Sequence, residues 1–256
     1  AVSGAAGKMG SQVCRTVLAD PDLKLVAAVD KTSLGSDIGI LLGLSSLNTA
    51  ITDNLEKALK ESKAEVMVDF THPQSVMANI RTAVASGVHA VVGTTGITKE
   101  NLAEIENLLG PAKSNVFIAP NFALGAVLMM QFAAAATKYF PQVEIIELHH
   151  DQKADAPSGT AIKTAEMLSA QAFGGKEEET IKGARGGVHN NVHIHSVRLP
   201  GLVAHQEVIL GGQGQTLTIR HDSIDRTSFM PGVVMAIKAV KDRPGLTYGL
   251  EKLLEI

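Results

Sequence analysis

The sequence has little of what disulfide-bonded, membrane-spanning or nucleic-acid-binding proteins need. Its single cysteine, Cys14, excludes an intrachain disulfide and is typical of a reducing compartment. It has no tryptophan, two tyrosines and a net charge of −3, which argues against a nucleic-acid-binding surface. The longest apolar run, residues 122–136, is interrupted by Gln131 and is too short to span a membrane. We therefore expect no nucleic-acid partner and no membrane segment.

A metal-binding pattern is also missing. The second half of the chain is rich in histidine, but no cysteine and no paired carboxylates accompany these residues to complete a set of ligands. We interpret them as polar positions on an antiparallel sheet and predict no metal site. They are His189, His193, His195, His205 and His221.

The length of the chain predicts more than one domain. At 256 residues it exceeds the usual size of a single hydrophobic core. The first residues already have the pattern of a strand, so we expect that a few residues or a targeting peptide preceded Ala1. No signal peptide is visible. We expect a cytoplasmic location, or a plastid location if a transit peptide was removed.

Up to about residue 120, short apolar runs alternate with helical patterns. Strands are predicted at 24–29, 66–70, 88–92 and 116–119, and helices at 9–19, 55–62, 75–85 and 99–109. Continuous apolar strands separated by helices are typical of a parallel sheet that is covered on both faces. This part of the sequence predicts a Rossmann-like, doubly wound α/β domain.

After residue 121 the pattern changes to that of an α+β domain. A long apolar helix precedes a strand at 143–148, a helix at 160–172, a mobile loop at 174–190 and strands at 192–199, 206–210 and 215–221. Sequential strands joined by short turns are expected to pair with one another in an antiparallel manner, which predicts an antiparallel-rich sheet. A final helix at 233–240 is expected to return to the first domain.

A glycine-rich turn joins the first strand to the first helix. In Gly4-Ala-Ala-Gly-Lys-Met-Gly10, Gly4 permits a tight turn, Gly7 allows a pyrophosphate to approach the backbone, and Gly10 allows close packing of the helix. The amino end of the helix would face the phosphates. The spacing is G-x-x-G-x-x-G, less specific than the common dinucleotide motif, and a turn without a ligand is the alternative.

Asp30 strengthens the dinucleotide interpretation. It ends the second predicted strand, where an acidic side chain can hold the ribose hydroxyls of the adenosine. Lys31 follows and could pair with a 2′-phosphate. An acidic and a basic residue side by side suggest a site that accepts both NADH and NADPH.

Three further segments follow predicted strands at the edge where open α/β sheets bind ligands. They are Asp69-Phe-Thr-His-Pro73, Gly93-Thr-Thr-Gly96 and Ala119-Pro-Asn-Phe122. Each alone could be a helix cap, as we expect for Thr98. Their agreement favours a dinucleotide site.

The most informative segment of the second half runs from His149 to Thr160. It places His149, His150 and Lys153 shortly before Ser158-Gly-Thr160, where a helical pattern begins. Imidazole titrates near neutral pH, and an ammonium group is a compact positive charge with three donors. A helix amino end beside such groups suits a small anionic substrate that must also receive a proton. A polar surface loop before a capped helix is the alternative.

In their order and spacing, the glycine turn, Asp69-Phe-Thr71, Gly93-Thr-Thr-Gly96, Asn121-Phe122 and the segment 149–160 resemble the dihydrodipicolinate reductases of lysine biosynthesis. The resemblance covers essentially the whole chain. It implies reduction of a cyclic imine carrying two carboxylates, or its 4-hydroxy precursor, by NADH or NADPH in a homotetramer. It also implies a dinucleotide-binding domain at 1–121 and 233–256 and a substrate-binding and oligomerisation domain at 122–232.

The resemblance assigns roles to individual residues. His149 matches the acid/base residue of the family and Lys153 its proton donor. The carboxylate-binding set matches His150, Lys153, Ser158, Gly159 and Thr160. The cofactor contacts, with Lys31 added from its position, match Gly4, Ala5, Ala6, Gly7, Lys8, Met9, Asp30, Gly93, Thr94, Thr95, Ala119, Pro120, Asn121 and Phe122.

The sequence departs from the family at three positions. Lys8 stands where the family often has arginine, which keeps the charge but loses the bidentate geometry. Asp151 and Gln152 stand where basic residues are frequent, so the rim of the pocket is less positive. Two other functions fit the same domains: a different two-domain amino- or hydroxy-acid dehydrogenase, and a non-catalytic dinucleotide sensor, which would have no use for His149 and Lys153.

Overall fold

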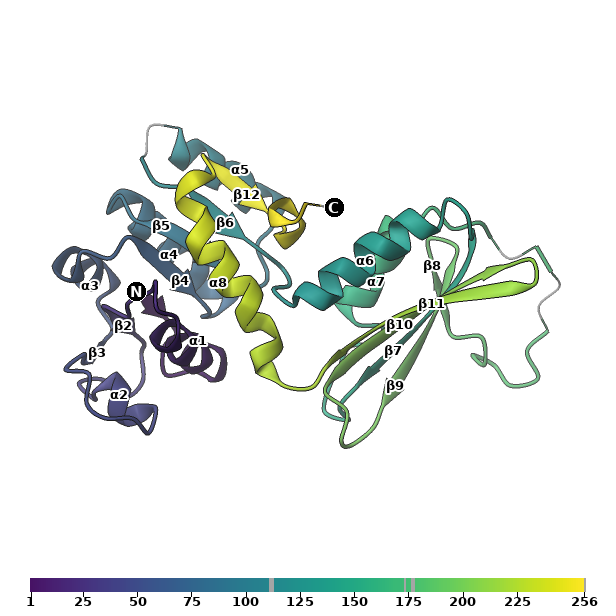
Figure 1. The fold of residues 1–256 in the computed structure, drawn as a ribbon, viewed down its shortest axis with the longest axis horizontal. Coiled ribbons are helices and arrows are strands. Elements are labelled where there is room, and N and C mark those ends of the chain that lie inside the picture. Colours follow the sequence, from purple (N-terminus) through teal and green to yellow (C-terminus); the bar gives the residue numbers. More distant parts are fainter. Residues whose placement is uncertain (111–112, 173, 176–177, 256) are drawn as a thin grey trace. The chain divides into compact units, whose positions relative to one another are not determined.

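The computed structural model describes residues 1–110, 113–172, 174–175 and 178–255. These residues form two compact units (Figure 1). Unit 1 contains residues 1–122 and 229–255, and unit 2 contains residues 123–228. Within the described ranges, no helix has the length and apolar character that crossing a membrane requires.

Unit 1 is built on a parallel sheet with the strand order β12-β6-β5-β4-β1-β2-β3. The chain order reverses between β1 and β4, and open α/β sheets bind ligands at the carboxyl ends of strands beside such a reversal. The strands are β1 (Val2–Ser3), β2 (Ala28–Val29), β3 (Ile51–Thr52), β4 (Val66–Asp69), β5 (His89–Val92), β6 (Val116–Ile118) and β12 (Leu246–Tyr248).

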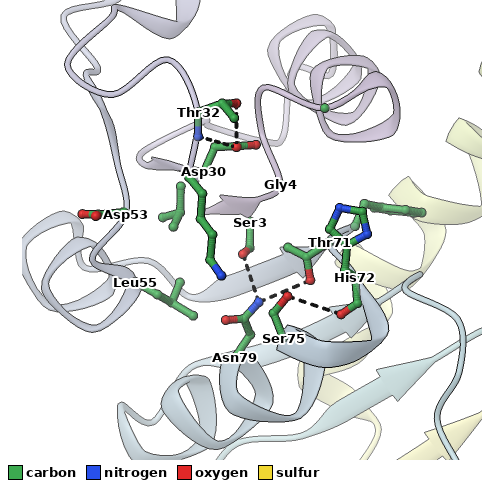
Figure 2. Close-up of a pocket in the computed structure, with 14 residues that line it drawn as sticks. Ser3, Gly4, Asp30, Thr32, Asp53, Leu55, Thr71, His72, Ser75 and Asn79 are labelled. Atoms are coloured by element: carbon green, nitrogen blue, oxygen red, sulfur yellow. Dashed lines mark hydrogen bonds between the residues drawn. The ribbon is translucent and has the colours of Figure 1, made fainter.

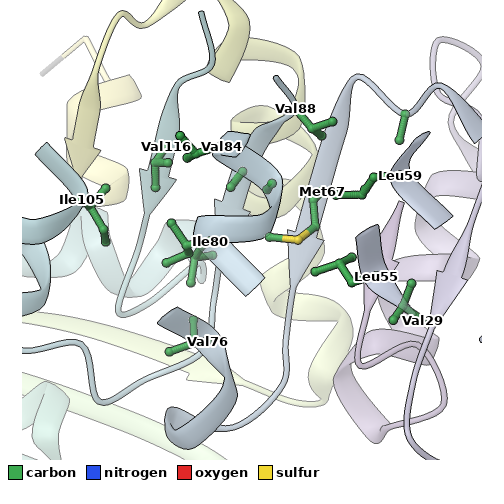
Figure 3. Packing of buried hydrophobic residues seen from close by; sticks show 14 of the residues in the cluster. Val29, Leu55, Leu59, Met67, Val76, Ile80, Val84, Val88, Ile105 and Val116 are labelled. Carbon is green, nitrogen blue, oxygen red and sulfur yellow. The ribbon is translucent and has the colours of Figure 1, made fainter. Parts of the chain in front are cut away.

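Helices cover this sheet, and the core of the unit lies between them and the strands. On one face, Met67 of β4 packs in a buried cluster with Ile80 and Ile105 from the helices that follow (Figure 3). Val68 and Val91 are buried on the opposite face, since successive side chains of a strand point to opposite sides. The helices are α1 (Lys8–Ala19), α2 (Ile38–Leu41), α3 (Leu55–Ser62), α4 (Pro73–Ala85), α5 (Lys99–Leu109) and α8 (Met230–Ala239), with 3-10 turns at Val240–Asp242 and Leu250–Leu253. A further 3-10 turn, Arg226–Phe229, lies where the chain passes from unit 2 to unit 1.

The structure corrects the sequence-based description of unit 1 in one strand. The predicted strand at 24–29 is wrong in its extent, because β2 covers only Ala28–Val29. Leu25 and Ala27 are buried, but the two-residue strand β1 offers pairing partners only to Ala28 and Val29. The sequence patterns also do not predict the short elements α2, β3 and β12.

Unit 2 has a mixed sheet with the strand order β11-β10-β7-β9-β8. Two helices cover one of its faces: α6 packs on β10 and β11, and α7 packs on β7 and β8. The strands are β7 (Gln142–His149), β8 (Gly187–His189), β9 (Val192–Arg198), β10 (Ala204–Gly212) and β11 (Gln215–Ser223), and the helices are α6 (Leu124–Ala136) and α7 (Gly159–Met167). The two sheets confirm the predicted fold class.

The order of strands in unit 2 differs from a simple meander. β7 lies at the centre, antiparallel to β10 and parallel to β9. The expectation that sequential strands pair with one another is right for β10 and β11 and wrong for β9 and β10, which β7 separates. An apolar pattern specifies which face of a strand is buried, but it does not specify the neighbour.

Two further predictions in unit 2 are wrong. Residues 187–189, part of the predicted loop at 174–190, form β8, and the tight turn at Asn190 and Asn191 (φ of 50° and 63°) joins it to β9. Residues 176–177 of that loop lie outside the described residues. Helix α7 ends at Met167 rather than at residue 172, because the side-chain amide of Asn190 donates hydrogen bonds to the carbonyl groups of Ala165 and Leu168 at the end of the helix.

Candidate functional site

The turn after β1 requires glycine at two positions. Gly4 has a φ of 82°, a conformation that other residues rarely adopt. A Cβ atom at position 10 would lie 1.9 Å from the carbonyl oxygen of Gly4, so α1 begins close against the turn. Gly7 is the N-cap of α1 and brings no side chain to cap it. The amide groups of the first helical turn can therefore receive an anion.

A cavity of about 380 Å³ lies at the carboxyl ends of β1, β2 and β4 (Figure 2). This volume is within the range of small-molecule sites. The lining comes from the glycine turn, the segments that follow β2, β3 and β4, and α4. The lining residues are Ser3, Gly4, Gly7, Val29, Asp30, Lys31, Thr32, Asp53, Leu55, Phe70, Thr71, His72, Ser75 and Asn79.

Asp30 connects the glycine turn to the end of β2. Its carboxylate accepts hydrogen bonds from the amide of Ala6 (2.9 Å) and from the amide and hydroxyl of Thr32 (both 2.9 Å). Partial burial opposes ionisation, but the bonds from Thr32 and Ala6 outweigh it and lower the pKa of Asp30. The carboxylate is ionised at neutral pH, and its two oxygens have further lone pairs for hydroxyl donors.

A second carboxylate, that of Asp69, organises the end of β4. It is fully buried and accepts hydrogen bonds from the Thr94 hydroxyl (2.6 Å), the Asn79 amide (2.7 Å), and the hydroxyl (2.8 Å) and backbone amide (3.1 Å) of Thr71. Asn79 also donates to Ser3 (Figure 2). These bonds fix the segments after β4 and β5 against α4.

The structure brings together only part of the predicted cofactor set. Gly4, Gly7, Asp30 and Lys31 line the cavity. The remaining residues of the glycine turn do not line it: Ala5 is buried, Ala6 binds Asp30, Lys8 is exposed at the start of α1, and Met9 is half-buried.

The segments after β5 and β6 do not line the cavity either. Phe122 is buried, with its ring centroid 5.9 Å from that of Phe70. A Cβ atom at Gly93 would lie 2.2 Å from the Phe70 ring. The other residues of these segments are Thr94 and Ala119, which are buried, Thr95 and Pro120, which are exposed, and Asn121, which is half-buried.

In unit 2, a row of polar side chains interrupts the otherwise apolar face of the sheet beneath the helices. Glu147 lies opposite Gln206 on one side and Ser196 on the other, and Gln206 lies opposite His221. The preceding positions on this face are apolar and buried, as at Ile145. The row reaches the end of β7 from which the chain continues to α7.

Glu147 is the centre of this polar cluster. Its side chain is fully buried, and its two oxygens pair with the two terminal nitrogens of Arg198 at 2.7 and 2.8 Å. They also accept hydrogen bonds from the backbone amide of Ser158 (3.1 Å) and meet Nδ1 of His149 at 2.5 Å. Burial opposes ionisation, but Arg198, Ser196 and His149 outweigh it and lower the pKa of Glu147.

The contact with Glu147 specifies the state of the His149 ring. Burial is the main cause that lowers the pKa of His149; Glu147 opposes it, and the positive charges of Lys153 and Arg198 add to it. The ring is therefore neutral at neutral pH. Since a carboxylate faces Nδ1, that nitrogen carries the hydrogen and donates it, which leaves Nε2 as an acceptor.

Lys153 lies in the turn between β7 and α7. Its Nζ contacts the Asp155 carboxylate at 2.7 Å. The side chain of Lys153 is 22% exposed, and that of Asp155 is 60% exposed. The turn is closed by a hydrogen bond from the Lys153 amide to the His150 carbonyl (3.2 Å). His150 itself is exposed. Two basic side chains can thus reach an anion at this turn.

Ser158 is the N-cap of α7, and two backbone amides in the first turn of the helix are available to bind a ligand. The Ser158 hydroxyl accepts a hydrogen bond from the Ala161 amide (3.2 Å), and its own amide donates to Glu147. Among the described residues, no hydrogen bond occupies the amides of Gly159 and Thr160. A carboxylate at this end of α7 would receive these two amides and the favourable helix dipole.

Sequence reasoning misses Glu147 and Arg198 as parts of this site. Glu147 ends a strand-like apolar run, and a charged residue on the buried face of a strand is a signal in itself. Arg198 is near the end of β9, 51 residues away in the chain, and no local pattern connects the two.

The histidines of the second half have other partners. His193 Nδ1 lies 2.7 Å from the carbonyl of Arg185, His195 lies 2.7 Å from Glu144, and His205 lies 2.6 Å from Asp222. In the part of the chain that the structure describes, no three His, Cys, Asp or Glu side chains are placed to hold a metal ion.

Comparisons with known proteins agree over the whole chain. The family profile "Dihydrodipicolinate reductase, N-terminus" matches residues 1–122, and "Dihydrodipicolinate reductase, C-terminus" matches residues 125–254. The 4-hydroxy-tetrahydrodipicolinate reductase of Desulfitobacterium hafniense is 54% identical over 261 residues, which cover 99% of this chain and 97% of the relative. That of Listeria monocytogenes is 52% identical over 260 residues, with 100% and 99% covered.

A solved structure is similar over the same length. It is the dipicolinate-bound dihydrodipicolinate reductase from Paenisporosarcina sp. TG-14, which is 44% identical to this chain. The TM-score is 0.89, and the match covers 99% of this chain and 98% of the other.

The lowered pKa of His149 predicts a pH-dependent stability. Below about pH 6.5, the ordinary value for histidine, the unfolded chain takes up a proton that the folded protein binds less readily, so stability is lost as the pH falls. His89 and His221, whose pKa values burial also lowers, act in the same direction. We expect the Tm to fall as the pH is lowered from 7.5 to 5.5. The change of Tm with pH should be smaller in His149→Asn. It should be unaltered in His150→Asn, which changes an exposed neighbour. Equal slopes in all three proteins would contradict this assignment.

Proposed function

The chain belongs to the dihydrodipicolinate reductase family, and we propose that unit 2 binds the dicarboxylate substrate at the amino end of α7 and protonates it from Lys153. The protein is an oxidoreductase of lysine biosynthesis with 4-hydroxy-tetrahydrodipicolinate reductase activity. This finding replaces the two alternatives, a dehydrogenase of another substrate and a non-catalytic sensor. What remains to be assigned is the role of each residue.

One observation carries the proposed site. The two oxygens of Glu147 hold the Ser158 amide at the start of α7 and the ring of His149 at the end of β7. An anion-binding helix end and a titratable ring therefore lie on either side of a single carboxylate. A substrate with two carboxylates needs several donors, and the amides of Gly159 and Thr160, the Lys153 ammonium group and the His150 ring supply them.

The state of His149 supports Lys153 as the proton donor. Reduction adds a hydride to one ring carbon of the substrate and leaves an electron pair in the conjugated system, which then takes up a proton. A neutral His149 with hydrogen on Nδ1 has no proton on Nε2 to give, whereas Lys153 carries three. We assign to His149 the role of an acceptor, because its Nε2 can accept a proton or a hydrogen bond at the same site.

Unit 1 is proposed to bind the nicotinamide cofactor, NADH or NADPH, as its dinucleotide-binding domain. When bound, the cofactor supplies the hydride. The glycine turn and the available amides of α1 fit its pyrophosphate, and the ionised Asp30 fits a ribose with free hydroxyls. Lys31 lines the same cavity and fits a 2′-phosphate. This set of groups supports acceptance of both cofactors.

We assign a homotetramer to the protein. The face of the unit 2 sheet that α6 and α7 leave uncovered carries half-buried apolar side chains, which further subunits could bury: Ile146, Leu148, Val197 and Ile209. We expect light scattering at micromolar concentration to give the mass of four chains. A monomeric mass would contradict the assignment.

The activity is tested with substrate made in place. Pyruvate and aspartate semialdehyde, condensed by the preceding enzyme of the pathway, should support oxidation of NADH and NADPH by this protein, followed at 340 nm. Omission of the preceding enzyme is the control. We expect kcat/KM values for the two cofactors within about a thousandfold of each other, because Asp30 and Lys31 act in opposite directions. No oxidation of either cofactor would contradict the reductase activity, and a larger preference would contradict the dual site.

Lys153 is tested by substitution. Lys153→Ala should lower kcat by at least about 10²-fold, the usual contribution of a positioned proton donor, with little change in the Kd for NADH. Lys163→Ala is a matched control, since this lysine lies on α7 and pairs only with Glu166 at 3.6 Å among the described residues. An unchanged kcat in Lys153→Ala would remove Lys153 from the mechanism.

A further inference from the structure

We propose that Glu147 and Arg198 are positioning residues of this reductase, whose buried ion pair holds His149 in one tautomer and fixes the start of α7. The inference rests on the proposed function, in which those two elements meet the substrate. Neither residue needs to touch the substrate for this role. The pair acts through the groups to which it is hydrogen-bonded.

Burial of the Glu147 carboxylate costs folding free energy, which indicates that the residue serves such a purpose. The side chain is fully buried on a face of the sheet whose preceding positions are apolar, as at Ile145 and Val208. Removing a carboxylate from water costs several kcal/mol, and only paired and hydrogen-bonded charges compensate for it. An apolar residue of similar volume at this position would avoid that cost. The polar choice is therefore informative about function.

The first effect of the pair is on the ring of His149. In a free histidine both tautomers are populated, and only one of them leaves Nε2 as an acceptor. The carboxylate at 2.5 Å from Nδ1 selects that tautomer, and Arg198 prevents the carboxylate from taking up a proton itself. Without Glu147, the ring would lose both its orientation and the nearby negative charge that raises its pKa.

The second effect is on the turn and the helix that receive the substrate. Glu147 accepts from the Ser158 amide, and Arg198 Nη2 donates to the carbonyl of Asp155, the residue that pairs with Lys153 (both Arg198–Asp155 and Lys153–Asp155 at 2.7 Å). The same ion pair therefore holds both ends of the segment that connects Lys153 to α7. The distances from the amides of Gly159 and Thr160 to Lys153 therefore depend on the Glu147–Arg198 pair.

The chain provides a matched control on the same strand. Glu144 also pairs with one arginine and one histidine, Arg185 at 2.6 Å and His195 at 2.7 Å. It lies three residues before Glu147 and therefore points to the opposite face of β7, and its side chain is 35% exposed. Loss of Glu144 removes an equivalent ion pair without changing the substrate face.

The experiment compares Glu147→Gln with Glu144→Gln. For Glu147→Gln we expect kcat to fall at least about tenfold, as when the carboxylate partner of a working histidine is lost, with the acid limb of the kcat/KM profile moved to lower pH. Glu144→Gln should retain kcat within about twofold and keep the profile. Equal losses in the two variants would mean a purely structural role for both and would overturn the proposal.

A measurement on the substrate-free protein separates this inference from the proposed function. Long-range ¹H–¹⁵N spectra of histidine-labelled protein, with the His149 signals assigned from His149→Asn, report its tautomer and its titration. We expect hydrogen on Nδ1 in the unsubstituted protein at pH 7 and in Glu144→Gln, and a loss of this preference in Glu147→Gln. Hydrogen mainly on Nε2 in the unsubstituted protein would overturn the proposal, whether or not the imine is reduced.

If Glu147→Gln does not fold, Arg198→Lys tests the proposal in its place. Lysine keeps the charge but cannot reach both carboxylate oxygens and the Asp155 carbonyl at once. We expect a folded protein with the Nδ1 tautomer retained, a kcat several-fold lower and a raised KM for the imine, because the turn that holds Lys153 is loosened. Unchanged kcat and KM would remove Arg198 from the positioning role.

Discussion

A carboxylate can remain ionised inside a protein only where other donors replace the water that it loses, and this constraint shapes unit 2. Glu147 meets it with the guanidinium of Arg198, the amide of Ser158 and the ring of His149. Each donor belongs to a different segment: β9, the start of α7 and the end of β7. Satisfying one buried charge therefore requires three segments to meet at one point, and that point is where the substrate is proposed to bind.

Unit 1 also contains a buried acid that is surrounded by hydrogen-bond donors. The Asp69 carboxylate is fully buried at the end of β4 and is surrounded by donors from Thr71, Thr94 and Asn79. These bonds fix the backbone segments that follow two neighbouring strands, β4 and β5, against helix α4. In both units, a buried acid at a strand end stabilises irregular backbone that would otherwise be free to move. Asp69 itself does not line the cavity, whereas Asp30 does and retains lone pairs for a ligand.

The sequence predicts features that depend on local chemistry and fails where distant segments must be placed. Helices α3 and α5 occupy the predicted ranges because Asn54 and Thr98 cap them with their own side chains. The parallel sheet and the fold class follow from hydrophobic periodicity, and the glycine turn follows from the spacing of its glycines. The place of β9 beside β7 does not, since an alternating pattern fits several neighbours equally well. The pairing of Glu147 with Arg198, 51 residues apart, is beyond local patterns for the same reason. The family resemblance, which matches motifs rather than contacts, also leaves it out.

The charges around Lys153 indicate how a bound dicarboxylate would complete the proposed site. Without a ligand, Lys153 is balanced by Asp155 and Arg198 by Glu147, and burial keeps His149 neutral, so the cluster is close to electrically neutral. A substrate that brings two negative charges offers the Lys153 ammonium group a second anionic partner. The exposed Asp155 can then give up Lys153 to a substrate carboxylate, whereas the buried Glu147 cannot give up Arg198 without leaving a charge unpaired. The fold thus separates a fixed ion pair, which maintains geometry, from an exchangeable one, which responds to the ligand. Lys153, the proposed proton donor, belongs to the exchangeable pair, so a substrate carboxylate bound at this turn would release it from Asp155.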